Sequence, residues 1–504
     1  MEVSSLNDNK DKSLLMDYYQ LTMSRAHYNN GTHEDIAYFD MFFRSIPDNG
    51  GYAVFNGLDK VIEYVLNFKF SESDIQLLSD KGDFDEDFLR YLSDFKFTGD
   101  IWAVPDGTVV FPREPLITVR GNKIEAQLLE TKLLLIINYA SLISTKAARI
   151  VNAAQGRSVL EFGARRAQGE SASIEGAKYA YIAGCDGTAN IQAEKEYGIP
   201  SSGTMAHSYI EAFDNEYDAF LSYAKAYPES SIFLIDTYDT LYSGILNAIK
   251  VAKNYLEPNG YRLKGVRLDS GDLAWLSKEV RKILNENGMD DCKIIASNSL
   301  DEFTIKSLIE QGAKIDVFGV GERLITSKSN PVFGGVYKLV AIERDNEIVP
   351  RIKLSENEAK VTTPGFKKSY RFYDQETGYA LGDVIALADE VIPDDKYVLV
   401  NDALPWQQTT LTNYNVRELQ VPVFKDGELV YDMPSIEERR AYCKRELATL
   451  YPEVRRFDNP HGYYANLSSE LARMKYDLIL SQKQAINKNK GNGRVFARKV
   501  DYES

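Results

Sequence analysis

Charged residues that follow short apolar segments are the part of this sequence best suited to chemistry. Arg165 and Arg166 come directly after the apolar run Ser158 to Phe162. A guanidinium group presents a planar set of donors that matches the oxygens of a carboxylate or a phosphate. Two arginines at the end of a predicted strand therefore indicate an anion site, with a surface salt bridge as the alternative interpretation.

A histidine occupies a comparable place further along the chain. The segment Gly203 to Ser208 precedes a helix expected to start at Tyr209, so His207 lies on a turn beside backbone N–H groups, with Thr204 in the same turn. Such a histidine can transfer a proton or become phosphorylated, because the start of a helix favours nearby negative charge. A purely structural histidine is the alternative.

The segment Arg267 to Asp272 has the same layout of cation, apolar residue, carboxylate and helix start. Asp269 could bind sugar hydroxyls or a hydrated Mg²⁺, whereas Asp272 more plainly caps the helix that follows. Arg267 and Asp269 are two residues apart and share one face of the predicted strand. This pair favours a sugar phosphate site, although Asp269 could also be a helix cap.

Two further loops suit phosphate binding, because small residues leave their backbone N–H groups accessible. One contains Ser297 and Asn298, and the other contains Gly319 and Gly321. Glycines at strand ends are more often simple turns, and a dinucleotide fingerprint is excluded because Leu324 replaces its third glycine. The signal is that all these loops converge on one edge of the predicted fold.

The elements that must position these residues are short apolar runs, each followed by a turn and a helix. Their recurrence is typical of βα units and predicts an irregular or incomplete TIM-like α/β barrel, with an open doubly wound sheet as the alternative. In such a barrel the chemistry lies at the carboxyl ends of the strands. The expected strands are Ser158 to Phe162, Tyr181 to Ala183, Ser231 to Ile235, Gly265 to Leu268, Lys293 to Ala296, Ile315 to Phe318 and Val336 to Ile342.

The 504 residues divide into three predicted regions. Residues 1–125 form an N-terminal α+β domain on which some C-terminal strands pack, residues 126–345 form the catalytic barrel, and residues 346–504 form a C-terminal extension with a basic tail, Lys488 to Lys499. Expected elements also include a helix Leu14 to Tyr28, a strand Ile36 to Phe43, an apolar helix Ile124 to Ala154, a capping box of Ser299 with Glu302, and a capped helix Ser435 to Leu450.

Composition limits the partners and the compartment. A formal charge of −15 argues against nucleic acid or an anionic membrane as the main partner. Cys185, Cys292 and Cys443 are widely separated, which favours a reducing compartment and excludes a metal site built on cysteine pairs. The N-terminus lacks the apolar core of a signal peptide, and no eighteen apolar residues run together. We therefore expect a cytoplasmic protein.

In this order, these residues resemble the nicotinate phosphoribosyltransferases, type II phosphoribosyltransferases related to the enzymes that use nicotinamide. The resemblance covers nearly the whole chain. Its most specific segments are Asp17 to Gln20 with Thr22, Phe39 to Pro47, Gly51 to Phe55, Glu161 to Arg166, Gly203 to Ser208, Arg267 to Asp272 and Gly334 to Lys338.

The resemblance implies a homodimer with an active site completed across the interface. Tyr19 of the second copy would stack on the pyridine ring opposite Phe162, since stacking suits a flat heteroaromatic. Arg165, beside Arg166, would meet the carboxylate of nicotinate, together with Thr204 and with Arg267 unless that arginine serves phosphate. Asp269 would hold the ribose hydroxyls, and the 5′-phosphate site would be formed by Ser297, Asn298, Gly319, Gly321 and Thr326.

The implied reaction joins nicotinate to 5-phosphoribosyl-1-diphosphate and releases diphosphate, giving nicotinate mononucleotide for NAD salvage. Mg²⁺ would accompany the substrate phosphates. The resemblance also implies coupling to ATP hydrolysis through a phosphorylated histidine, and His207 matches that position.

Other functions remain open at this stage. Nicotinamide enzymes carry an aspartate shortly after a Gly-Thr pair, but here Thr188 is followed by Ala189 and Asn190, which favours the acid over the amide on grounds of charge. Quinolinate enzymes are typically much shorter. A sugar phosphate isomerase could recruit Asp236 or Asp239 as a base, and a non-catalytic scaffold could retain the same fold.

Overall fold

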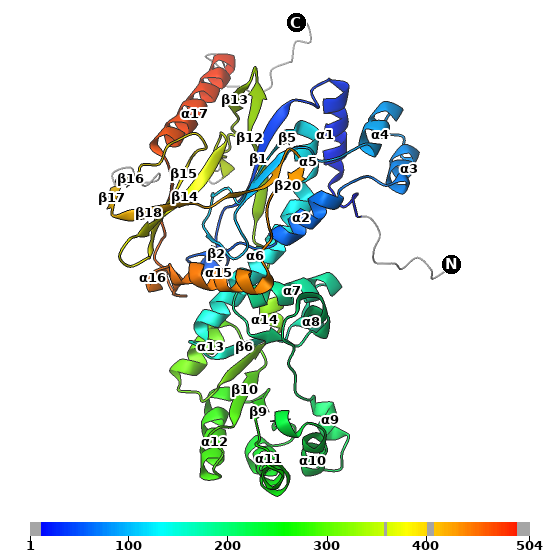
Figure 1. Cartoon of the computed structure of the whole chain (residues 1–504), viewed down its shortest axis with the longest axis vertical. Coiled ribbons are helices and arrows are strands. Elements are labelled where there is room, and N and C mark those ends of the chain that lie inside the picture. The colour runs from blue at the N-terminus through cyan, green and yellow to red at the C-terminus, as the bar shows by residue number, and fades with distance from the viewer. Residues whose placement is uncertain (1–11, 357–359, 401–407, 491–504) are drawn as a thin grey trace.

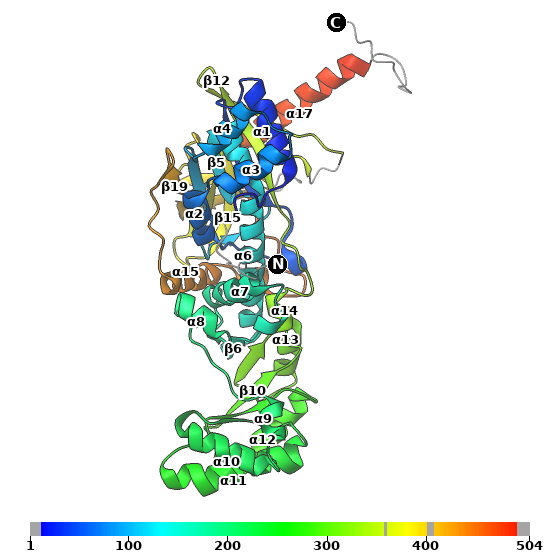
Figure 2. The same ribbon diagram turned by 90° about the vertical axis from the view of Figure 1, so that its right-hand side faces the viewer.

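The computed structural model describes residues 12–356, 360–400 and 408–490, so most of the expected basic tail lies outside the described residues. The chain forms two bodies, with mostly antiparallel sheets in the upper one and a parallel sheet in the lower one (Figure 1). The long helix α6 (Glu130–Ala153) runs from one body to the other (Figure 2).

The lower body is built on a six-stranded sheet in which all neighbouring strands are parallel. Its order is β7-β6-β11-β10-β9-β8. The strands are β6 (Ser158–Glu161), β7 (Gly187–Thr188), β8 (Ile232–Leu234), β9 (Gly265–Leu268), β10 (Lys293–Ser297) and β11 (Val317–Val320). The carboxyl ends of all six strands therefore meet at one edge.

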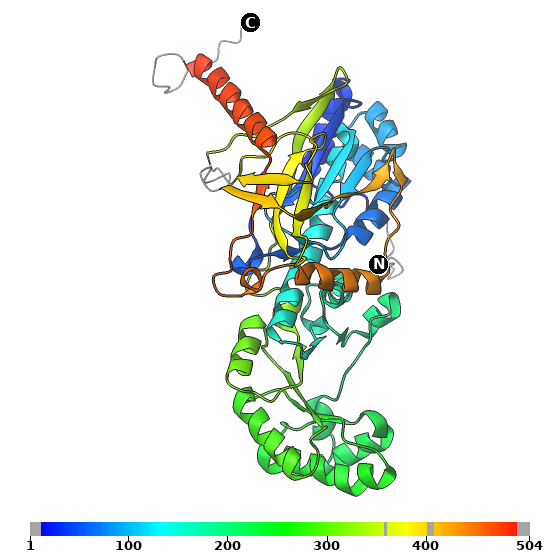
Figure 3. The same cartoon turned by 60° about the vertical axis from the view of Figure 1, so that its left-hand side comes forward.

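The mixed α/β fold with a parallel sheet is confirmed, but the expected barrel is not. Within the described residues the sheet stays open, because β7 and β8 are its two edge strands and do not pair with each other. These edge strands contain two and three residues, and the chain between them forms helices α8 to α10 instead of a bridging strand. Figure 3 shows these helices beside the open side of the curved sheet.

Two of the expected parallel strands were wrong. Tyr181 to Ala183 forms the end of helix α7 (Glu170–Ile182) and not a strand. The segment is apolar because this end of the helix packs into the core. Val336 to Ile342 is a strand, β12 (Gly335–Arg344), but it pairs antiparallel with β1 (Ile36–Phe43) in the upper body. An apolar run does not reveal which sheet it joins, so the domain boundary predicted at residue 345 follows a strand of the upper sheet.

Helices cover the lower sheet. In addition to α7, they are α8 (Ile191–Tyr197), α9 (His207–Glu211), α10 (Glu216–Ala226), α11 (Ile245–Val251), α12 (Leu273–Glu286), α13 (Glu302–Glu310) and α14 (Glu322–Ile325). The expected capping box of Ser299 with Glu302 was wrong. The cap of α13 is Asp301, which accepts a hydrogen bond from the N–H of Thr304, whereas Ser299 has a positive φ of 53°.

The upper body centres on a seven-stranded sheet of order β13-β12-β1-β5-β3-β19-β20. β1 matches the expected strand, and the remaining strands are β3 (Asp100–Ala103), β5 (Ile117–Asn122), β13 (Glu347–Pro350), β19 (Val421–Lys425) and β20 (Glu428–Leu429). The short strands β2 (Ala53–Val54) and β4 (Val109–Val110) pair separately. Its helices are α1 (Tyr18–Asn29), α2 (Leu58–Asn67), α3 (Glu72–Asp80), α4 (Glu86–Ser93) and α5 (Lys123–Leu128).

The C-terminal part adds a four-stranded sheet of order β18-β14-β15-β21 and a separate hairpin. The four strands are β14 (Lys367–Asp374), β15 (Ala380–Leu387), β18 (Tyr414–Glu418) and β21 (Ala465–Leu467), and the hairpin is β16 (Lys396–Val400) with β17 (Gln408–Thr412). Helices α15 (Ile436–Ala448), α16 (Pro452–Arg455) and α17 (Ser469–Lys490) follow. The capping box predicted at Ser435 is confirmed, since Ser435 and Glu438 exchange hydrogen bonds at the start of α15.

The helical segment Lys123–Ala153 is long and apolar enough, by length and composition, to cross a membrane. However, 67% of its most apolar window is buried inside the protein. Leu133, Ile137 and Ile143 of α6 are fully buried in the two largest apolar clusters. The segment therefore has the burial expected of a core helix that joins the two bodies.

Candidate active site

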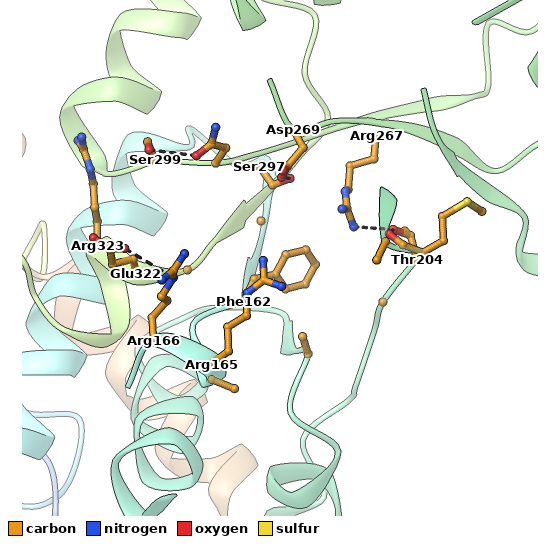
Figure 4. A pocket seen from close by; sticks show the side chains of 18 of the residues that line it. Phe162, Arg165, Arg166, Thr204, Arg267, Asp269, Ser297, Ser299, Glu322 and Arg323 are labelled. Atoms are coloured by element: carbon orange, nitrogen blue, oxygen red, sulfur yellow. Dashed lines mark hydrogen bonds and ion pairs between the residues drawn. The ribbon is translucent and has the colours of Figure 1, made fainter. Parts of the chain in front are cut away.

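A pocket of about 520 Å³ lies at the carboxyl edge of the parallel sheet. Ten of the residues predicted from the sequence line it, namely Phe162, Arg165, Arg166, Thr204, Arg267, Asp269, Ser297, Asn298, Gly319 and Gly321. They come from the ends of β6, β9, β10 and β11 and from the loop before α9 (Figure 4). Their convergence follows from the parallel sheet, which brings the ends of distant strands together.

The ring of Phe162 is held at the pocket wall by its backbone and by two glycines. Its N–H donates to the carbonyl of Val320 at 2.7 Å. A Cβ atom at Gly319 would lie 2.5 Å from the ring, and one at Gly321 would lie 2.9 Å from the carbonyl oxygen of Phe162. Both positions therefore need glycine for close packing, a reason that differs from the predicted phosphate binding.

The two neighbouring arginines have different surroundings. Arg165, in the short helical turn Ala164–Arg166, makes no ion pair with any described residue, and it lines the same pocket as Phe162 (Figure 4). Arg166 has its Nε 3.7 Å from Glu322 Oε2, and 62% of its side chain is exposed. Arg165 is therefore the cation available to a ligand, while Arg166 fits the surface salt bridge considered as the alternative.

Arg267 is anchored on one side only. Its Nη1 donates a hydrogen bond of 2.6 Å to Thr204 Oγ1, while its buried Nε has no partner within the described chain. Burial lowers the pKa of Arg267, and the nearby carboxylates of Asp269 and Asp236 oppose that effect. A partly buried guanidinium with an unpartnered donor atom is suited to bind an anion.

Asp269 is held in place by polar contacts from two neighbouring strands. The hydroxyl of Ser297 donates to its Oδ1, and its backbone N–H donates to Asp236 Oδ2 at 2.8 Å. Asp236 also accepts from the Ser270 hydroxyl at 2.6 Å, and its buried Oδ1 has no partner in the described structure. Asp236 thus positions the loop that carries Asp269. This role was not predicted from the sequence, and the only signal for it is that Asp236 lies just after β8.

His207 is the first residue of α9 and lies at the edge of the pocket rather than among its lining residues. Its Nδ1 is 3.1 Å from the hydroxyl of Thr237, and its Nε2 is 3.9 Å from Asp269 Oδ2. The imidazole therefore faces the carboxylate that was predicted to hold the ribose. Thr237 was not predicted from the sequence, and its only signal is its position three residues beyond the end of β8.

Asp239, the other carboxylate considered as a possible base, is a helix cap. Its Oδ1 accepts hydrogen bonds from the N–H groups of Leu241 and Tyr242 at 2.9 and 2.7 Å. This contact gives Asp239 a structural reason to be present. Asp239 therefore gives no support to the alternative of a sugar phosphate isomerase.

The end of the pocket opposite Arg267 is rich in cations and in unusual backbone. Asn298 and Ser299 both have positive φ, 82° and 53°, which most residues rarely adopt. Arg323 and Lys328 also line the pocket, and neither was predicted. They pair with Asp301 and Glu322, respectively. Arg323 and Lys328 do not directly follow the end of β11, so the pattern of strand ends did not indicate them.

Besides His207, two predicted residues do not line this pocket. Thr326 ends α14, and its hydroxyl donates to the carbonyl of Glu322 at 2.7 Å. Tyr19 lies on α1 in the upper body with 45% of its surface exposed, and burial followed by the nearby Glu130 raises its pKa to about 12. A contact of Tyr19 with this pocket would need a second copy of the chain.

No group of three or more His, Cys, Asp or Glu side chains that could hold a metal ion is found among the described residues. The pocket instead offers single carboxylates beside cations. A divalent ion would therefore fit here only with most of its ligands supplied by a substrate, since Mg²⁺ is commonly bound through one or two carboxylates plus phosphates.

Comparison with known proteins gives a consistent family. Residues 14–138 match the model of the nicotinate phosphoribosyltransferase N-terminal domain, residues 158–371 that of the nicotinate phosphoribosyltransferase family, and residues 366–475 that of its C-terminal domain. The chain is 45% identical over 482 residues to the nicotinate phosphoribosyltransferase of Bacillus subtilis, with 95% of this chain and 97% of the relative covered.

More distant relatives agree over a similar length. The human nicotinate phosphoribosyltransferase is 32% identical over 533 residues, covering 94% of this chain and 97% of the relative. The crystal structure of human nicotinic acid phosphoribosyltransferase matches with a TM-score of 0.81 and 31% identity, covering 92% of this chain and 99% of that one.

Proposed function

The chain belongs to the nicotinate phosphoribosyltransferase family and carries that activity, and from this premise we propose which residues perform it. The pocket at the carboxyl edge of the sheet binds nicotinate at the Phe162 and Arg165 side and the ribose phosphate beyond it. The observation that carries this assignment is that Arg165, which makes no ion pair with any described residue, lines the same pocket as the flat ring of Phe162. Together they match an anionic aromatic acid.

The reaction needs positioning and charge stabilisation rather than a base. The lone pair of the pyridine nitrogen forms a bond to carbon-1 of the ribose, while the bond from that carbon to the diphosphate oxygen breaks and diphosphate leaves. Stacking on Phe162 orients the nucleophile, and Asp269, fixed by Ser297 and Asp236, holds the ribose hydroxyls. The free Nε of Arg267 offers a hydrogen bond to an anionic group.

Mg²⁺ is proposed to enter with the substrate phosphates. When bound, it would neutralise charge on the leaving diphosphate. Asp269 and the unpartnered Oδ1 of Asp236 are the carboxylate oxygens best placed to touch it or its water ligands. Arg323, Lys328 and the backbone at Asn298 and Ser299 would meet phosphate oxygens at the other end.

ATP coupling is proposed to act through His207. Its Nδ1 is engaged with Thr237, which leaves Nε2 facing Asp269 and the substrate side of the edge. A phosphoryl group on Nε2 would move a negative charge next to the site and alter how the two substrates are held. The step transfers the γ-phosphoryl group of ATP to nitrogen with release of ADP, and later hydrolysis returns phosphate.

A homodimer is proposed because Tyr19 lies in the upper body, away from the pocket of its own chain. Exposed apolar side chains accompany it on the same helix and just before it, namely Leu15, Tyr18 and Met23. A second copy would cover this surface and bring its Tyr19 to the open face of the bound pyridine ring. A cytoplasmic location is proposed with it.

The test is formation of mononucleotide from 5-phosphoribosyl-1-diphosphate with either nicotinate or nicotinamide, each with and without ATP. The expected result is product from nicotinate only, stimulated by ATP. Equal use of nicotinamide would favour the alternative acceptor and contradict the assignment of Arg165. Absence of product from both bases would point back to an unrelated sugar phosphate enzyme.

A further inference from the structure

A carboxylate that the mechanism above does not use lies directly before Phe162. Glu161, the last residue of β6, has no exposed surface and makes no ion pair with any described residue. Its Oε1 accepts a hydrogen bond from the N–H of Gly163, and its Oε2 accepts one of 2.7 Å from the Thr188 hydroxyl. Burial raises the pKa of Glu161. A buried carboxylate without a cation is costly and needs a reason.

The contact with Thr188 fixes the loop that follows β7. Thr188 donates its hydroxyl proton to Glu161 and accepts the N–H of Asn190 at 3.0 Å. The N–H of Ala189 donates to the backbone carbonyl of Glu161 at 2.9 Å. Asn190 is also engaged, because its Oδ1 accepts the N–H of Gln192. Of these loop residues, only Ala189 lines the pocket.

The contact with Gly163 fixes the other wall. Gly163 precedes the turn that carries Arg165, and a Cβ atom at Gly163 would lie 2.7 Å from Glu161 Oε1 and 2.5 Å from Ile325. The main chain is thus packed tightly against the carboxylate. The single side chain of Glu161 therefore bonds to both walls of the pocket half assigned to the pyridine ring.

We propose that Glu161 is a positioning residue for the base: it clamps the Phe162 to Arg165 wall and the Thr188 to Asn190 wall at a fixed separation suited to one flat ring. The clamp also keeps the polar groups of the second wall occupied, so that this wall presents the methyl group of Ala189 to the base. This inference rests on the proposed placement of nicotinate between these walls.

The clamp predicts a selective change in affinity. Glu161→Gln keeps the volume of the side chain but offers only one good acceptor, and Thr188→Val keeps the shape but removes the hydroxyl. Each is expected to raise the KM for nicotinate about tenfold, the size of one lost hydrogen bond to a charged group. The KM for 5-phosphoribosyl-1-diphosphate is expected to stay within about twofold. Thr188→Ser, which restores the hydroxyl, is expected to recover the affinity for nicotinate.

Glu125→Gln is the matched control. Glu125 is also a buried carboxylate whose pKa is raised by burial, and it accepts hydrogen bonds from the N–H and the hydroxyl of Thr98. It lies on α5 in the upper body, away from the pocket. Its replacement tests the loss of such a carboxylate elsewhere in the fold and should leave both KM values unchanged.

The decisive measurement is a double-mutant cycle on the KM for nicotinate. If Glu161 and Thr188 act as one clamp, the double variant is expected to be no worse than the poorer single variant. Additive effects, an equal rise in both KM values, or a Glu161→Gln variant that behaves like Glu125→Gln would overturn the proposal. If Glu161→Gln does not fold, the Val and Ser variants of Thr188 decide alone. An inactive wild type would instead contradict the proposed function.

Discussion

Gly319 and the ring of Phe162 are in such close contact that a Cβ atom on the glycine would lie 2.5 Å from ring atom Cδ2. That distance is far inside van der Waals contact, and a second ring atom would lie at 2.6 Å, so a side chain at this position would clash with the ring. β11 runs beside β6, and Gly319 is the register partner of Leu160. The adjacent strand thus sets the orientation of the stacking surface.

Replacement of Gly319 by alanine is expected to displace the Phe162 ring and to weaken nicotinate binding. Because the added methyl group must push the ring towards the pocket, we expect the KM for nicotinate to rise by at least about tenfold, the equivalent of ~1.4 kcal/mol. Steady-state kinetics would measure it. Gly462→Ala is the control, since a Cβ atom there would meet nothing within 4 Å. Unchanged KM in Gly319→Ala would show that the ring does not orient the base.

Arg165 and Arg166 allow the two interpretations of the arginine pair to be separated. Arg165→Lys removes the fork geometry but keeps the charge, so we expect the KM for nicotinate to rise roughly 10- to 100-fold. Arg166→Lys should have a smaller effect, because Arg166 is 62% exposed and pairs with Glu322. Isothermal titration with nicotinate would measure the affinities directly. Equal losses in the two variants would mean that both arginines bind substrate.

His207 gives a prediction on energy coupling. His207→Ala is expected to abolish the stimulation by ATP while leaving the slower ATP-independent reaction, because the imidazole faces Asp269 from the edge and does not line the pocket. Product formation and release of ADP would be followed together. His461→Ala, at an exposed position in the loop between α16 and β21, is the control. ADP release by His207→Ala at the rate of the wild type would exclude a phosphorylated His207.

Most of the site could be predicted from the sequence because the site residues follow directly after strands. Phe162, Arg267, Asp269 and Ser297 end up together because parallel strands share one carboxyl edge, a property that holds for an open sheet as well as a closed barrel. The sequence did not predict roles that depend on contacts between segments distant in the chain. The role of Asp236 depends on its reach to the Asp269 backbone, and nothing in the local sequence encodes that distance.

The same difference between local and long-range contacts applies to the fold. Local signals predicted β1, a mostly apolar strand, and α15, which starts with a capping box. They did not predict that the apolar run Val336 to Ile342 leaves the parallel sheet to pair with β1, since its partner lies some three hundred residues earlier. The sequence also did not predict whether the sheet closes into a barrel, because closure depends on whether β7 and β8 pair.

Asp106 provides a prediction on stability and pH. Its buried carboxylate accepts from the N–H of Leu58 at 2.9 Å and from Arg439 Nη1 at 3.1 Å. Burial, followed by the charge of Asp59, raises the pKa of Asp106 to about 6. The folded state therefore binds this proton more tightly than the unfolded state does. Stability from this group is present at acidic pH and is lost as the pH rises from about 4 to about 6.

Asp106→Asn removes that titration while retaining an acceptor for Leu58. The difference in unfolding free energy, wild type minus variant, is expected to fall by ~1–3 kcal/mol between pH 4 and pH 7. Denaturant titrations at several pH values would measure it. Asp85→Asn should show the opposite trend, because the N–H of Phe88 and Arg25 lower the pKa of Asp85 and its contribution is lost as the pH falls. A pH-independent difference for Asp106→Asn would mean that Arg439 keeps this carboxylate ionised across the whole range.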